Sequence, residues 1–321
     1  MNNNNYTIAI PVYERLLGFE EAIQSAINVI GCTEILVVDD NSSHNEFEII
    51  SNLINDSRVR YIRNVSNIGL FGNWNNCVML SKNEYISILC SDDIIMPNAF
   101  SLFLDACKTE KDIDVFFGSF ATFEKTVSDG VLHRTFKKGK IKALDLYTIA
   151  IHKGPGFPVL SILRKSKVLN FPFVSKPHSG NDWLWIYSNA MSLNLYATDK
   201  IINFWRRHPD QDAVKSQSIT MDCWPMMFKL IAFQLVGIDN RLSIKAMRRA
   251  KGIILSFLLN DYKYWENRIN NIEKIDNIFI DDIIKIIKES WILTNLLKYG
   301  KANIFIYNIG RVYRKIGYYP S

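Results

Sequence analysis

The chain has 321 residues, of which 48% are hydrophobic and 22% charged, a composition that excludes disorder and provides a sizeable core. Its formal net charge of +6 permits attraction to anionic lipid, nucleic acid or a phosphorylated small substrate without choosing among them. Five widely spaced cysteines without a C-x-x-C pair indicate neither a disulfide framework nor a zinc knuckle. The start lacks the pattern of a secretory signal, and no apolar stretch reaches the roughly 20 residues of a membrane span, so we expect a cytoplasmic protein.

Strand and helix signals alternate along the first third of the chain. Runs of apolar and β-branched residues predict strands at 6–12, 34–39, 59–63, 84–90 and 114–117, and apolar residues at helical spacing predict helices over 19–30, 70–80 and 97–107. Strands that alternate with helices in this way form a mostly parallel sheet with right-handed crossovers and helices on both faces. Residues 1–117 are therefore expected to form the nucleotide-binding half of an α/β, Rossmann-like domain.

The pattern changes near residue 118. Residues 118–215 contain short strands, Gly/Pro-rich loops and one helix that begins near Asp182, and we expect them to complete a pocket, so that 1–215 is one domain. Residues 216–321 have helical periodicity and form a C-terminal helical extension with clusters of Lys and Arg at 245–251 and 311–315. These clusters are either a solvated helix face or a surface that docks on an anionic membrane. The helical tail also offers a surface for an oligomer.

Polar residues follow four of the predicted strands. These segments are Pro11-Val12-Tyr13-Glu14, Asp39-Asp40, Asn67-Ile68-Gly69 and Asp92-Asp93. Because the carboxyl ends of parallel strands meet at the ligand-binding edge of an open α/β sheet, these segments should converge on one crevice. Two adjacent aspartates suit a cation or a hydroxyl-rich ligand, and the plain alternative is an Asp turn that caps the next helix.

The order and spacing of the four segments resemble those of the family 2 glycosyltransferases. In that family a GT-A fold carries strands that end in Pro-x-Tyr, Val-Asp-Asp-x-Ser, Asn-x-Gly and Asp-Asp-x-x-x-Pro, and the match here covers residues 6–97 and continues more weakly to about residue 212. The resemblance implies an inverting, metal-dependent hexosyltransferase that moves one sugar from a nucleotide-diphosphate sugar, with a UDP-sugar favoured over a dTDP-sugar. The lack of Gln-x-x-Arg-Trp and of membrane spans separates the chain from the processive synthases.

The resemblance also implies contacts with the donor nucleotide. It places Pro11, Tyr13 and Glu14 along the base and Asp40 on the imide N–H, which a carboxylate accepts in uracil or thymine. Asp39 is assigned a structural role. The alternative for the aspartates is helix capping, and the alternative for Tyr13 is a place in the core.

Three further donor contacts come from the same resemblance. Asn67 and Gly69 belong to the Asn-x-Gly segment, and Asn73 offers an amide where many members place an arginine. Asn67 can equally be an ordinary helix N-cap, whereas Gly69 supplies a backbone conformation or a close approach. Arg207 lies in Trp205-Arg206-Arg207-His208, which resembles the family's Tyr-Arg-x-His segment near the diphosphate.

The metal that the resemblance implies is Mn²⁺ or Mg²⁺, both of which prefer carboxylate and phosphate oxygens. Asp93 is the expected ligand, Asp92 is expected to contact the ribose or a metal-bound water, and His208 completes the metal's coordination or contacts the diphosphate. A structural histidine is the alternative. Cys90 stands where many members have the first aspartate, so the site has one carboxylate fewer.

An inverting transferase needs one base to take the proton of the acceptor hydroxyl. The family carries it in a Glu-Asp pair at the start of a helix, and the matching residue here is Asp182. Asn181 replaces the glutamate, which removes a neighbouring charge and should leave the pKa of Asp182 less raised. The alternative is a helix N-terminal residue favoured by the macrodipole.

The expected acceptor is a saccharide or a lipid-diphosphate-linked saccharide in surface polysaccharide synthesis, such as O-antigen, lipopolysaccharide or capsule, met at the inner face of the cytoplasmic membrane. One rival is a nucleotidyltransferase, which would need a Gly-rich basic loop where Tyr13-Glu14-Arg15 follows the first strand. A second is an inactive nucleotide-sugar-binding module, suggested by Cys90 and Asn181. Nucleic-acid binding lacks any recognised motif, and no nucleic-acid partner is expected.

Overall fold

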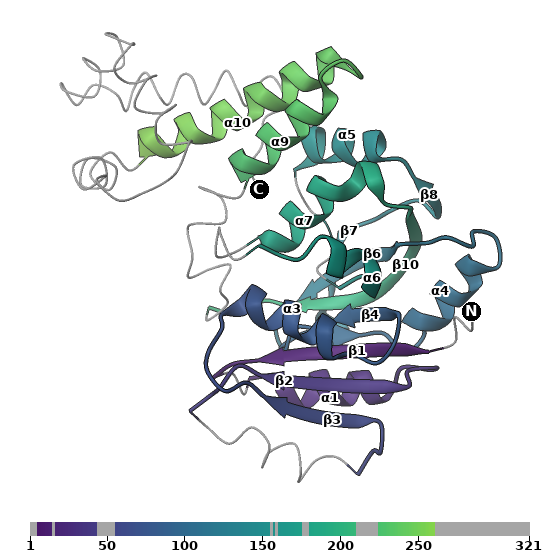
Figure 1. Ribbon diagram of the computed structural model, residues 1–321. Helices are drawn as coiled ribbons and strands as arrows, with labels where there is room; N and C mark the ends of the chain where they lie inside the picture. Colours follow the sequence, from purple (N-terminus) through teal and green to yellow (C-terminus); the bar gives the residue numbers. More distant parts are fainter. Residues whose placement is uncertain are drawn as a thin grey trace. The chain divides into compact units, whose positions relative to one another are not determined.

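Figure 1 shows the computed structural model of the chain. It describes residues 5–14, 17–43, 55–154, 157, 160–174, 180–209 and 224–260. The chain divides into two compact units, Met1–Ile219 and Thr220–Ser321.

The first half of the sheet is parallel. Strands β1 (Tyr6–Val12), β2 (Glu34–Asp39), β3 (Val59–Arg63) and β4 (Tyr85–Ile88) lie in the order β3-β2-β1-β4, and every neighbouring pair is parallel. Every residue of β1, β2 and β4 is buried, as continuous apolar runs in a covered parallel sheet require. The carboxyl ends of these strands therefore lie along one edge, and the predicted parallel α/β layout is confirmed for this half.

The second half is mixed. The order continues β4-β9-β6-β10-β5 through β9 (Ile162–Arg164), β6 (Val115–Phe123), β10 (Leu195–Arg206) and β5 (Ile94–Ile95). Strand β10 is parallel to β6, whereas β9 is antiparallel to both of its neighbours, and β7 (Val131–Arg134) and β8 (Gly139–Ile141) add antiparallel edges. The strand predicted at 114–117 is the first part of the longer strand β6, which continues to Phe123.

Helices cover both faces of the sheet (Figure 1). Helices α1 (Phe19–Ile27) and α4 (Ala99–Cys107) share a core with Tyr6, Ile8 and Ile10 on alternate positions of β1. Helix α3 (Leu70–Leu80) packs on β1, β2 and β4 and against α6 (Lys165–Asn170). The other described elements of this unit are the helices α5 (Ala143–Lys153) and α7 (Asn181–Asn189) and the 3₁₀ turns η1 (Val127–Asp129) and η2 (Ala190–Ser192).

The described part of the second unit is a helix pair, α9 (Trp224–Leu235) and α10 (Asn240–Asn260). Met227, Phe228 and Ile231 are buried on one side of α9, and Ala246 and Ala250 on one side of α10. Both segments are helical, as their periodicity predicted; the basic cluster at 311–315 lies outside the described residues. None of the described helices is both long enough and apolar enough to span a membrane.

Candidate active site

Asp39, the last residue of β2, is fully buried and holds the turn that follows it. Its Oδ1 accepts hydrogen bonds from the backbone N–H (2.9 Å) and hydroxyl (2.7 Å) of Ser42, and its Oδ2 accepts one from the Tyr61 hydroxyl (2.6 Å). A buried carboxylate with three donors is satisfied within the protein. Its role is structural.

Asp40 holds the loop that leads into α3. Its Oδ1 accepts from the Asn64 side chain (2.8 Å) and the Ile68 N–H (2.9 Å), and its Oδ2 accepts from the Gly69 N–H (2.9 Å). Gly69 has φ +81°, in the left-handed region that favours glycine, and it ends this loop as the N-cap of α3. Asp40 is itself buried, so both of its oxygens position the Asn-x-Gly segment in this conformation.

The two asparagines assigned to the donor differ in their surroundings. Asn73 is buried, donates to the carbonyl of Val38 (2.9 Å) and accepts from Asn64 (3.1 Å), so that it ties α3 to β2. Asn67 is exposed and accepts from the Gly69 N–H (3.0 Å). Asn67 is therefore the one that presents surface to a ligand.

The end of β1 offers an exposed aromatic ring. Pro11 is buried inside the strand, whereas Tyr13 is 49% exposed just beyond it. Glu14 follows with φ +49°, a strained value for a residue with a side chain, and is held by the Ser42 hydroxyl, which accepts from its N–H (2.9 Å), and by the Ser43 hydroxyl, which donates to its carboxylate (2.8 Å). The ends of β1 and β2 are thus locked together beside Tyr13.

The two aspartates after β4 are buried and anchored by Arg206. Asp92 and Asp93 are 3% and 2% exposed. The Arg206 N–H donates to Asp93 Oδ1 (2.9 Å), and its Nε donates to the Asp92 carbonyl (2.8 Å). Its guanidinium also pairs with Glu21 of α1 and lies 4.4 Å from the centroid of the Phe123 ring. The sequence interpretation did not assign this residue a role.

Gly18 packs against both Arg206 and Asp92 and so belongs to the same anchoring group. It is the N-cap of α1 with φ +79°, and a Cβ at this position would lie 3.1 Å from Asp92 Cα and 3.0 Å from Arg206 Nε. Only a residue without a side chain lets the start of α1 approach the aspartate turn so closely. Three segments far apart in the chain therefore fix the conformation of Asp92 and Asp93.

His208 joins this group from beyond the end of β10. Its Nε2 lies 2.9 Å from Asp92 Oδ2, and its buried Nδ1 has no hydrogen-bond partner within the described residues. Arg207, one residue earlier, is exposed, with its guanidinium 5.2 Å from the centroid of the Trp205 ring. The structure thus brings Asp92, Asp93 and His208 together and leaves Arg207 available at the surface.

Asp182 lies in the first turn of α7. The N-cap of this helix is Gly180, which has φ +77°. Burial raises the pKa of the Asp182 carboxyl to about 7, against the opposing effect of the backbone N–H groups of Asp182 and Trp183. Desolvation raises this pKa without the help of a second carboxylate, because Asn181 stands where the family has a glutamate. Asn181 itself is buried and donates to the Val174 carbonyl.

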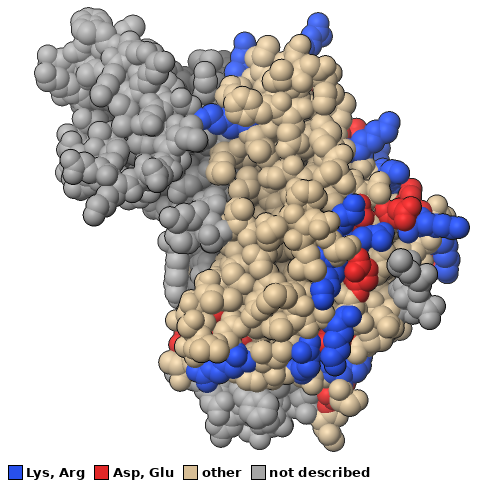
Figure 2. Space-filling model, in the orientation of Figure 1, with Lys and Arg blue, Asp and Glu red and all other residues tan. Residues whose placement is uncertain are grey.

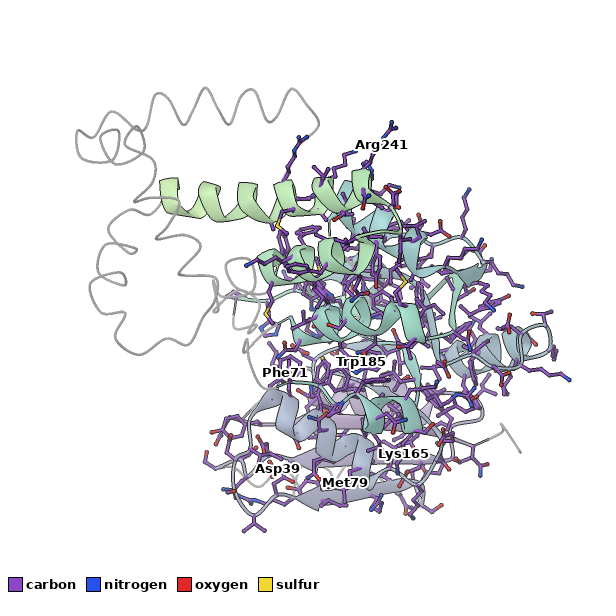
Figure 3. The ribbon with its side chains drawn as sticks, turned by 45° about the horizontal axis from the view of Figure 1, so that its top comes forward. Asp39, Phe71, Met79, Lys165, Trp185 and Arg241 are labelled. Carbon is purple, nitrogen blue, oxygen red and sulfur yellow. The ribbon has the colours of Figure 1, made fainter. Side chains whose placement is uncertain are left out.

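An aromatic cluster and one asparagine tie the segment before α7 to α3. The Asn75 amide donates to the Phe173 carbonyl (2.8 Å) and accepts from its N–H (2.9 Å). The Phe173 ring lies 5.4 Å from Trp74 and 5.5 Å from Trp185, and Figure 3 shows Phe71 of α3 and Trp185 of α7 on neighbouring elements. This packing fixes the acceptor half, which carries Asp182, on the nucleotide half.

The model of glycosyl transferase family 2 matches residues 7–168, just over half of the chain. The chain belongs to glycosyl transferase family 2. The match contains the parallel half of the sheet, except for the first residue of β1, and the aspartate turn after β4.

Curated relatives agree with this family. The chain is 29% identical over 126 residues to glycosyltransferase GlyG of Streptococcus pneumoniae, which is 39% of this chain and 41% of that protein. It is 28% identical over 188 residues to the GalNAc(5)-diNAcBac-PP-undecaprenol beta-1,3-glucosyltransferase of Campylobacter jejuni, which is 56% of this chain and 58% of that protein. It is 32% identical over 105 residues to the putative colanic acid biosynthesis glycosyl transferase WcaA of Escherichia coli, covering 32% of this chain and 38% of that protein. The chain thus spans about two to three fifths of the relatives' lengths.

Among solved structures, S. aureus TarS 1-349 in complex with UDP-GlcNAc superimposes with a TM-score of 0.58 over 85% of this chain and 77% of that chain. The sequence identity is 16%, so this likeness establishes the GT-A glycosyltransferase fold alone. It confirms the predicted fold class.

The site can be tested against the metal that this family implies. No group of three or more His, Cys, Asp and Glu side chains that could hold a metal ion occurs in the described part of the chain. Mg²⁺ is, however, usually bound by one or two carboxylates together with substrate phosphates. A histidine with one ring nitrogen on a carboxylate and the other buried without a partner also has the usual arrangement of a metal ligand, and His208 with Asp92 has it. Asp93 and His208 therefore fit a cation that takes its other ligands from a diphosphate.

Proposed function

We propose that this family 2 protein is an inverting glycosyltransferase that moves one hexosyl group from a nucleotide-diphosphate sugar to a saccharide acceptor. The observation that carries the proposal is the pairing of two features in one unit. One is the anchored group of Asp92, Asp93 and His208 at the strand ends, and the other is Asp182, a half-buried carboxyl with its pKa raised to about 7. The first suits a diphosphate with a cation, and the second suits a general base at neutral pH.

In the proposed reaction Asp182 accepts the proton of the acceptor hydroxyl as that oxygen bonds to the anomeric carbon. The bond from the anomeric carbon to the diphosphate oxygen breaks from the opposite face, and the nucleoside diphosphate leaves with the electron pair. A bound Mn²⁺ or Mg²⁺, held by Asp93 and His208, would neutralise the charge that develops on the leaving diphosphate. Arg207, which is exposed and precedes His208 in the chain, is the proposed phosphate contact.

The nucleotide and acceptor are proposed from two relatives. A UDP-sugar is favoured, with a dTDP-sugar second, because the structural relative TarS is described in complex with UDP-GlcNAc and with UDP. The exposed ring of Tyr13 beside Asp40 is the proposed place for the base. The C. jejuni relative is named for a saccharide on undecaprenol diphosphate, which supports a lipid-diphosphate-linked acceptor in surface polysaccharide synthesis.

A peripheral contact with the inner face of the cytoplasmic membrane follows from this acceptor and from the α9–α10 pair. Phe233, Val236 and Ile238 are each more than 60% exposed around the turn between the helices. Arg241 and Lys245 lie exposed on α10, and Figure 3 shows Arg241 pointing away from the ribbon. Lys and Arg side chains are also more abundant than Asp and Glu on the face in Figure 2. Exposed apolar and basic residues together favour an anionic membrane surface.

The decisive experiment is a binding and turnover screen with UDP-, dTDP- and GDP-sugars in the presence of Mn²⁺. Thermal shift reports donor binding, and release of the nucleoside diphosphate reports hydrolysis or transfer. We expect Asp182→Asn to bind the donor without turning it over, and Asp93→Ala to lose the part of donor affinity that EDTA removes from the wild type.

Two results would count against the proposal. Binding of a donor with no turnover in the wild type for any sugar would favour the inactive nucleotide-sugar-binding module. Donor affinity that neither EDTA nor Asp93→Ala changes would remove the metal assignment while leaving the transferase in place.

A further inference from the structure

A row of rings crosses three strands beside the site. Phe120 of β6, His133 of β7 and Trp205 of β10 form it: the His133 ring lies 5.0 Å from Phe120 and 6.2 Å from Trp205, the second contact being edge-to-face. The guanidinium of Arg207 lies 5.2 Å from the Trp205 centroid. Phe120 is buried, Trp205 is half-buried, and His133 is exposed. The row therefore has a hydrophobic floor and an open aromatic surface.

The pleat of β10 separates this row from the anchor of the aspartates. Successive side chains of a strand point to opposite faces, so Arg206, which turns to Asp92 and Glu21, leaves its neighbour Trp205 on the other face. The register supports this assignment, because Trp205 pairs with Thr122 and Phe120 lies two residues before Thr122 on the same side of β6. The row thus lies directly behind the strand end that carries His208.

The row is also connected to the predicted base. Arg134 follows His133 in β7, and the charges of Arg134 and Asp182 both act on the pKa of the Tyr187 hydroxyl, Arg134 lowering it and Asp182 raising it. Tyr187 is buried in α7, one and a half turns after Asp182. The charges of Arg134 on β7 and Asp182 on α7 therefore both reach the Tyr187 hydroxyl.

We propose that His133 and Trp205, over the floor of Phe120, form the subsite for the sugar ring of the acceptor saccharide. This inference rests on the proposed transferase function. Aromatic rings can pack against the C–H face of a pyranose, and the imidazole edge can exchange hydrogen bonds with its hydroxyls. The base of the donor is expected at β1 and β2, which β4, β9 and β6 separate from β10, so the row is not its place.

The lowered pKa of the His133 imidazole suits an uncharged ligand such as a sugar. Partial burial of its ring and the positive charges of Arg134 and Arg207 lower the pKa of His133. The lowered pKa favours the uncharged imidazole, which has one donor and one acceptor nitrogen for hydroxyl groups. A charged imidazole would have favoured an anion instead.

The test measures binding of p-nitrophenyl β-glycosides of glucose, galactose, GlcNAc and GalNAc to the full chain in the presence of UDP. Saturation-transfer NMR detects the bound glycoside. We expect at least one glycoside to bind the wild type and to bind Trp205→Leu and His133→Ala about tenfold more weakly, the factor for loss of one aromatic contact. Trp205→Phe should retain most of the affinity. Leu132→Ala, at an exposed neighbour on β7 that points to the other face, is the matched control and should change nothing.

Affinity for UDP, measured on every variant by calorimetry, shows that the fold and donor site persist. Equal glycoside binding by the wild type and both ring variants would overturn the inference, and so would the absence of glycoside binding by a wild type that binds UDP. A wild type that binds no nucleotide sugar would instead contradict the proposed function itself. The two failures are therefore distinguishable.

Discussion

Replacement of Asp182 by asparagine tests the assignment of the base through stability as well as activity. Burial raises the pKa of this carboxyl from 3.8 to about 7. The difference of about three pH units corresponds to roughly 4 kcal/mol of unfolding free energy, because one unit is worth about 1.4 kcal/mol. The side chain is partly exposed, and solvent screening reduces the expected effect to about 2–4 kcal/mol.

The sign follows from proton binding. Between about pH 4 and pH 7 the folded protein keeps a proton on Asp182 that the unfolded chain releases, so the free energy of unfolding falls as the pH rises through this window. Above about pH 7 both states are ionised and the destabilisation is complete. Asparagine never ionises. The variant should therefore match the wild type near pH 4 and be more stable by about 2–4 kcal/mol near pH 8.

Urea unfolding followed by tryptophan fluorescence at both pH values measures this difference, and transfer assays on the same samples measure activity. For the wild type, kcat/KM should rise with pH through an apparent pKa near 7, and the variant should be inactive throughout. Asp145→Asn, which changes an exposed carboxylate in the first turn of α5, is the matched control and should show neither effect. A stability difference that is the same at both pH values, or transfer by the variant at the wild-type rate, would refute the reasoning.

Three further substitutions probe the framework of the site. Arg206→Met removes the Nε–H bond to the Asp92 carbonyl and the ion pair with Glu21, keeps the backbone N–H that binds Asp93, and should lower unfolding free energy by about 1–3 kcal/mol and weaken UDP-sugar binding in calorimetry; unchanged binding would contradict the anchoring role. Gly18→Ala forces a side chain to φ +79° against Asp92 and should cost about 1–3 kcal/mol in urea unfolding, whereas a neutral result would mean that α1 shifts freely. Asn75→Leu leaves the Phe173 backbone groups unpaired and should cost about 2 kcal/mol and slow transfer, with UDP affinity retained; a loss of UDP affinity would argue against a role confined to the acceptor half.

The elements that could be predicted from the sequence are those whose environment is uniform. Strands β1 and β2 are buried on both faces, so their residues form continuous apolar runs, and the predicted and observed bounds coincide. Strand β5 has two residues and exists only through its pairing with β10, and β7 is exposed along most of its length. Neither has a local pattern to detect. The same holds for α6, whose six residues give too short a window for helical periodicity.

The site divides in a similar way. Its location could be predicted, because strand ends in an α/β sheet converge whatever their partners. The individual contacts of Asp40 and Asn73 could not, because their partners Asn64 and Val38 depend on how the loop before α3 closes. One sequence signal does distinguish Arg206 from Arg207. Strand alternation places Arg206 and Arg207 on opposite faces, so one of them had to be structural.

Arg206 explains why motifs so far apart in the chain must occur together. The aspartate turn after β4 contains two buried carboxylates, and repulsion between them would open it unless donors were fixed on both. The Asp93 carboxylate takes its donor from the backbone N–H of Arg206 at the end of β10, more than a hundred residues later. The guanidinium of Arg206 binds the Asp92 carbonyl and is held in turn by Glu21 and by the space that Gly18 leaves. The same chain segment then places His208 on Asp92. The donor site therefore forms only when the acceptor half has folded onto the nucleotide half, and a fragment that ends before β10 should keep the parallel strands but lose the geometry of Asp92 and Asp93.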